Sequence, residues 1–127
     1  MERTALRVAG VCGALAVVVG AFGAHGLKAR LAATGYAAQY DTGVLYHLVH
    51  TAALGMCALP GLSPRARRVA LWSFVAGVVL FSGSLYVLAL TGTKWLGAET
   101  PFGGTAFIVG WIALAVGAQA GGRTASP

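Results

Sequence analysis

Four long apolar segments separated by short polar stretches constrain the fold of this chain more than any other feature of its sequence. Hydrophobic residues make up 57% of its 127 residues and charged residues only 9%, against about 25% charged residues in an ordinary soluble domain. A helix that spans the hydrocarbon core of a bilayer needs about 20 apolar residues, so four spans and their connections use the whole chain. The sequence therefore predicts an all-α integral membrane protein with a single transmembrane domain, residues 1–127.

The apolar segments also predict the order and direction of the helices. The expected spans cover residues 5–24, 42–59, 69–90 and 101–120. Because the turns between them are short, consecutive spans should be antiparallel neighbours in an up-and-down four-helix bundle. Between the first two spans, leucines alternate with charged residues over residues 26–41. We expect a short helix lying at the membrane interface there.

The distribution of basic residues predicts the orientation of the bundle. With the N-terminus in the cytoplasm, the inner side carries Arg3, Arg7, Arg65, Arg67, Arg68 and Arg123, and the outer side carries Lys28, Arg30 and Lys94. Cytoplasmic loops of membrane proteins carry an excess of Lys and Arg, so we expect both termini in the cytoplasm. The net charge of +6 rests on these few residues between apolar runs and does not indicate nucleic-acid binding.

Polar residues of the predicted spans gather in the outer half of the bundle. At a rise of about 1.5 Å per residue, His47 and His50 of the second span lie at the same depth as Ser82 and Ser84 of the third. His25 lies at the outer end of the first span. The outer half also contains Tyr86 near the end of the third span and Thr100, Gly103 and Gly104 at the outer start of the fourth, and these nine residues together are called the outer cluster below. Because a polar group buried in lipid must find a partner, the outer cluster is expected to be a packing lock or a binding site.

Three functions remain open for the outer cluster. In the leading one, the histidines hydrogen-bond across helices, and the chain is a non-enzymatic structural, accessory or partner-docking protein. In the second, His25, His47 and His50 bind a divalent transition metal or a small ligand through neutral imidazoles. In the third, Ser82 or Ser84 is the nucleophile of an intramembrane hydrolase, although the sequence around them lacks the G-x-S-x-G turn.

Expected partners follow from the short loops, which leave little aqueous surface. They are the lipid bilayer, other membrane proteins or further copies of this chain, and nucleic acid is not among them. No cofactor is expected apart from the divalent metal of the second hypothesis.

Four motifs of the chain resemble those of a known family. They are Gly20-Ala21-Phe22-Gly23-Ala24-His25-Gly26-Leu27, Tyr46-His47 with His50, Phe81-Ser82-Gly83-Ser84-Leu85-Tyr86, and Thr100-Pro101-Phe102-Gly103-Gly104 with Gly110-Trp111. In this order and spacing they resemble the YgdD/YwdK family of small bacterial inner-membrane proteins of unknown function, to which the eukaryotic transmembrane protein 256 is also similar. Phe102 stands where that family usually has an aliphatic residue. The resemblance implies a multi-pass protein of the bacterial inner (plasma) membrane and implies no reaction, cofactor or substrate.

Overall fold

The structure is a computed structural model that describes residues 1–119 of the chain. Apart from one isolated bridge between Leu62 and Ala118, the regular elements of this range are all helices. In chain order they are α1 (Glu2–Ala24), α2 (Lys28–Thr34), α3 (Ala37–Met56), α4 (Pro64–Gly77), the π-helix η1 (Val78–Gly83), α5 (Ser84–Thr91), the 3₁₀-helix η2 (Lys94–Ala98) and α6 (Thr100–Gly117). The predicted all-α fold is confirmed.

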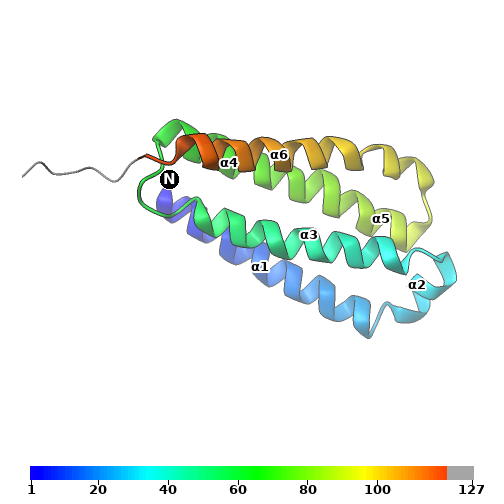
Figure 1. Cartoon of the computed structure of the whole chain (residues 1–127). Coiled ribbons are helices and arrows are strands. Elements are labelled where there is room, and N and C mark those ends of the chain that lie inside the picture. The colour runs from blue at the N-terminus through cyan, green and yellow to red at the C-terminus, as the bar shows by residue number, and fades with distance from the viewer. Residues whose placement is uncertain (120–127) are drawn as a thin grey trace, which may run out of the picture.

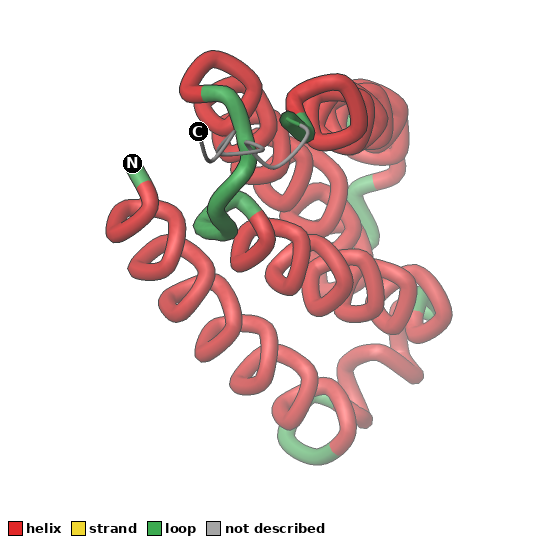
Figure 2. The backbone as a smooth tube through the Cα atoms, turned by 60° about the vertical axis from the view of Figure 1, so that its left-hand side comes forward, coloured by secondary structure: helices red, strands yellow, loops and turns green. Residues whose placement is uncertain are grey.

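The helices pack as two antiparallel pairs, α1 with α3 and α4 with α6 (Figure 1). Helix α3 also contacts η1 and α5 and thereby joins the two pairs. Helix α1 lies at the edge of the molecule (Figure 2), and Ala5 and Ala16 are its only buried residues. The start of α1 and the end of α6 lie at the same end of the bundle, called the terminal end below; α2 and η2 lie at the other, called the loop end (Figure 1).

Within the described residues, three helical segments are long and apolar enough to cross a membrane by length and composition: Glu2–Ala24, Pro64–Thr91 and Lys94–Gly117. Helix α3 has 20 residues and runs beside α1, but it carries polar residues such as Gln39 and Asp41 and is not among the three. It is nevertheless the fourth helix of the bundle, with both its histidines buried. The chain thus forms the predicted antiparallel four-helix bundle.

The helices differ most from the predicted spans at the start of the third span, which begins at Pro64 rather than at residue 69, and at α3. This helix begins at Ala37 rather than at residue 42, because the chain leaves α2 through Gly35, whose φ of 78° ends the shorter helix at once. The expected short helix between the first two spans is α2. Ala120, the predicted end of the fourth span, and Arg123 of the basic set lie outside the described residues.

Small residues allow the helices of each pair to approach closely. In α1, Gly13, Gly20 and Gly23 face Thr51, Val44 and Tyr40 of α3, respectively. Between α4 and α6, the ring of Phe107 lies over Gly77 and the ring of Phe74 lies over Gly110, each too close for a Cβ atom on the glycine. Packing of this kind replaces the hydrophobic drive that is missing between helices in lipid.

Candidate functional site

Ser82 and Tyr86 connect the long third span to α3 around Gly43. The Ser82 hydroxyl is fully buried and donates a hydrogen bond to the carbonyl oxygen of Gly43 at 2.7 Å. The absent side chain of Gly43 leaves room for the ring of Tyr86, whose hydroxyl shares a 2.9 Å hydrogen bond with Nδ1 of His47. The structure therefore brings together His47, Ser82 and Tyr86 of the outer cluster.

His50 lies among aromatic rings of α3, α4 and α6. Its ring stacks on Phe107 with centroids 3.5 Å apart, and the rings of Phe74 and Trp111 lie within 6.0 Å. Nδ1 of His50 donates to the carbonyl oxygen of Tyr46 at 2.8 Å, and Nε2 accepts a hydrogen bond from Nε1 of Trp111 at 3.1 Å. Both nitrogens of the neutral imidazole are thus used, and its one in-plane lone pair, on Nε2, is taken by the Trp111 N–H and is not open to a metal.

The three histidines do not meet at one point. His47 faces Tyr86, His50 faces Trp111, and His25 is exposed just after α1. Among residues 1–119, no group of three His, Cys, Asp or Glu side chains is placed to hold a metal ion. Nε2 of His47 is buried and has no hydrogen-bond partner in this part of the chain, so it is the one helical imidazole nitrogen left open there.

Ser84, Thr100 and the two glycines of the outer cluster connect the third span to the start of α6. The Ser84 hydroxyl donates to the carbonyl oxygen of Phe81 at 2.9 Å and lies 3.1 Å from the hydroxyl of Thr100. Gly103 packs directly on the backbone of Phe81, whereas Gly104 has ordinary contact distance to the same residue. These four residues lie close to one another, where the third span approaches the start of α6.

The π-helix η1, Val78–Gly83, is a feature that sequence reasoning missed. It lies within one continuous helical segment, Pro64–Thr91, and contains Ser82. Short π-helical turns within α-helices occur frequently at functional sites. The apolar pattern of residues 69–90 gives no signal of it, because a helix in lipid is mostly apolar on every side and has little periodicity to interrupt.

Helix α2 and Tyr40 close the loop end of the bundle. Nε of Arg30 donates to the carbonyl oxygen of Leu90 at 2.7 Å, and the hydroxyl of Thr34 donates to that of Ala89 at 2.6 Å, both in the last turn of α5. The buried Tyr40 hydroxyl donates to the carbonyl oxygen of Val19 in α1 at 2.5 Å. None of these contacts was predicted from the sequence.

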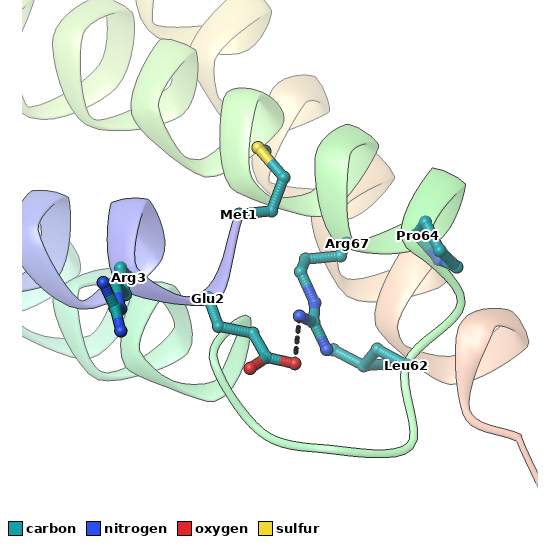
Figure 3. A pocket seen from close by; sticks show the side chains of 6 residues that line it. All are labelled: Met1, Glu2, Arg3, Leu62, Pro64 and Arg67. Atoms are coloured by element: carbon teal, nitrogen blue, oxygen red, sulfur yellow. Dashed lines mark hydrogen bonds and ion pairs between the residues drawn. The ribbon is translucent and has the colours of Figure 1, made fainter.

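At the terminal end, Arg67 is buried, although its position in a basic turn predicted a surface residue. Nη1 of Arg67 donates to Oε1 of Glu2 at 2.6 Å (Figure 3). Nη2 of Arg67 donates to the carbonyl oxygen of Leu59 at 2.9 Å. Arg67 and Glu2 line an open pocket of about 530 Å³ together with Arg3 and Pro64. Backbone hydrogen bonds from Ser63 to Gly117 and from Gln119 to Gly61 hold α6 against the same turn.

Comparison with known proteins places the chain in a family. A family model described as "Protein of unknown function (DUF423)" matches residues 19–104. The UPF0382 membrane protein YwdK of Bacillus subtilis (strain 168) is 46% identical over 109 residues, which cover 82% of this chain and 86% of the relative. The UPF0382 inner membrane protein YgdD of Escherichia coli (strain K12) is 37% identical over 123 residues, covering 92% of this chain and 90% of the relative.

A third relative extends the match over nearly the whole chain. The UPF0382 membrane protein of Haemophilus influenzae (strain ATCC 51907 / DSM 11121 / KW20 / Rd) is 40% identical over 118 residues, covering 92% of this chain and 94% of the relative. No solved structure matches this chain. The motifs that suggested the resemblance fall within these matches, and this chain belongs to the DUF423, or UPF0382, family of membrane proteins.

Proposed function

We propose that this protein is a non-enzymatic structural or accessory protein of the bacterial inner membrane, and that its outer cluster fixes the register of the bundle. The observation that carries this proposal is that side chains of the outer cluster form hydrogen bonds between different helices. Ser82 bonds α3, Ser84 lies beside Thr100 of α6, and Tyr86 bonds His47 of α3. The inner membrane is the location that the name of the Escherichia coli relative gives for that protein.

The environment of the two serines supports a non-enzymatic role. A nucleophilic serine needs a base within hydrogen-bond reach. The hydroxyls of Ser82 and Ser84 instead donate to the carbonyl oxygens of Gly43 and Phe81, and the imidazole of His50 is held by Trp111. A serine-reactive probe should therefore label neither serine in the folded protein, and labelling of either would favour the hydrolase reading.

If the outer cluster fixes the register of the bundle, removing one of its hydrogen bonds should lower the stability of the protein without releasing a ligand. Ser82→Ala and Tyr86→Phe should each lower the free energy of unfolding in mild detergent by roughly 0.6 kcal/mol and at most about 1.7 kcal/mol, the average and the maximum measured for hydrogen bonds between membrane helices. Thr105→Val is the matched control, because the Thr105 hydroxyl bonds only the Pro101 carbonyl of its own helix among the described residues. Equal effects of all three variants would contradict the lock.

The accessory role predicts a membrane-protein partner on α1, the long helix whose contacts with other long helices are mainly those with α3. A photo-crosslinking residue at Val11 or Val17, which are 63% and 64% exposed, should form adducts with the same single protein in cells. Val116 on α6 is 78% exposed and is the control position. If all three positions form adducts with lipid alone, no protein docks on α1. The structural role of the outer cluster would then remain as the proposal.

A second candidate, binding of a divalent metal or small ligand, is favoured by the unpartnered Nε2 of His47. Elemental analysis of protein purified without chelator tests it, with His47→Asn and His25→Asn measured in parallel. A near-stoichiometric transition metal that is lost in His47→Asn and kept in His25→Asn, whose imidazole is exposed just after α1, would support a site at His47. No metal in the unchanged protein would leave His47 as a structural residue.

A further inference from the structure

A long apolar groove follows the outer surface of the bundle where α4 packs against α6. It consists of two neighbouring hollows, of about 350 Å³ and about 610 Å³, that meet at Val69 and Val109, which line both. Small residues make its floor, since the Cβ of Ala66 rests against Gly117, and Trp72 and Val116 rise from its rims with 54% and 78% of their surface exposed. No residue of α1 or α3 lines this groove.

Two arginines without acidic partners stand at the terminal end of this groove. Arg65 lines one hollow and Arg68 lines the other, and their i,i+3 spacing in the first turns of α4 brings them to the same face. Within residues 1–119 the one ion pair is that of Arg67 with Glu2, and neither Arg65 nor Arg68 makes a side-chain hydrogen bond. The first turn of α4 contains no acidic residue to offset them.

The groove is longer than one leaflet of a bilayer is thick. Its lining on α6 extends from Gly117 to Phe102, which is roughly 22 Å at about 1.5 Å per residue. Half of a hydrocarbon core about 30 Å thick is roughly 15 Å. An acyl chain can therefore lie within the groove while the group attached to it stays level with the arginines. Trp72, one turn beyond Arg68, is a residue type enriched at this interface.

We propose that this groove holds an anionic glycerophospholipid, with its phosphate between Arg65 and Arg68 and an acyl chain along the seam of α4 and α6. Charge complementarity selects this occupant. A transmembrane helix of a partner, or a second copy of this chain, would fill the apolar part but would leave two cations unpaired at its end. Phosphate oxygens provide the bidentate acceptors that guanidinium groups favour. The proposal does not depend on the accessory role of α1.

Lipid binding by the full-length protein tests the charged part of the site. Protein purified in mild detergent is titrated with phosphatidylglycerol or with phosphatidylcholine of the same acyl chains, and bound lipid is counted by native mass spectrometry. We expect preference for phosphatidylglycerol, and a roughly thirtyfold weaker affinity in Arg65→Gln/Arg68→Gln, about fivefold for each arginine. Arg3→Gln/Arg7→Gln removes the same charge from the same end outside the groove and should leave the affinity unchanged.

A second variant tests the apolar part. Ala106→Leu places a larger side chain in the groove and should displace the lipid, whereas Ala115→Leu, on an exposed position of α6 outside the groove, should not. Equal affinity for both lipids, or equal losses in the two arginine pairs, would overturn the proposal. So would disulfide-linked dimers through Ser73→Cys that exclude phosphatidylglycerol, because a second copy would then be the occupant.

Discussion

The indole Nε1 of Trp111 donates a hydrogen bond to Nε2 of His50 at 3.1 Å, which joins α6 to α3 inside a group of stacked aromatic rings. The imidazole can accept this bond because its proton lies on Nδ1, which donates to the carbonyl oxygen of Tyr46. Trp111 thus fixes both the tautomer of His50 and the position of α6 relative to α3.

Trp111→Phe should lower the free energy of unfolding by roughly 0.6–1.7 kcal/mol, because Nε2 of His50 loses its donor in a buried site. The change is measured by titrating the folded protein in mild detergent with dodecyl sulfate. Trp72→Phe is the control, since Trp72 is 54% exposed and makes no side-chain hydrogen bond within the described residues. Equal losses in the two variants would show that ring size, and not the hydrogen bond, stabilises the contact.

Gly103→Ala should be strongly destabilising and Gly104→Ala should not, although the two residues are neighbours in one helix. A Cβ on Gly103 would overlap the backbone of Phe81, which cannot move without shifting η1, whereas at Gly104 the nearest atom is 3.9 Å away. Overpacking of this kind costs about 1–3 kcal/mol. Alanine at position 104 gains up to about 1 kcal/mol of helix propensity. Similar unfolding midpoints for the two variants would contradict the close approach of α6 to η1.

Much of this fold follows from the apolar runs of the sequence. The lengths of these runs predict how many helices there are and roughly where each lies. The short turns predict that consecutive helices are antiparallel. The rise per residue gives depth along a helix, and depth alone was enough to place Tyr86 and Ser82 beside α3. The contact of Ser84 with Thr100 was not predicted in this way, because Thr100 was placed only at the outer start of the fourth span.

The rotation of each helix about its own axis could not be predicted from the sequence. This rotation determines which side chains become the partners of His47 and His50. His47 and His50 are three residues apart, yet one bonds Tyr86 and the other bonds Trp111, because α3 is surrounded by helices. The π-helix η1 widens the helical turn at Ser82 without a signal in an all-apolar segment. The burial of Arg67 depends on Glu2, which lies 65 residues away in sequence and could not be paired with it from local pattern.

Glu2→Gln should destabilise the attachment of α1 at the terminal end, because the guanidinium of Arg67, 9% exposed, loses its counter-charge. The unfolding midpoint in dodecyl sulfate should fall, and the effect should shrink when Arg67→Gln is already present. Glu99→Gln is the control, since Glu99 makes no ion pair in residues 1–119. Additive effects of Glu2→Gln and Arg67→Gln would mean that the two side chains do not stabilise each other.

The orientation of the bundle predicts which end of the protein an impermeant reagent can reach. The terminal end carries Arg3, Arg7, Arg65, Arg67 and Arg68, and the loop end carries Lys28, Arg30 and Lys94, so the positive-inside rule puts the terminal end in the cytoplasm. In a background without Cys12 and Cys57, Lys94→Cys should react with an impermeant maleimide on intact cells. Arg68→Cys should react only after the cells are permeabilised. The reverse pattern would invert the proposed topology and would place the Arg65 and Arg68 groove in the outer leaflet.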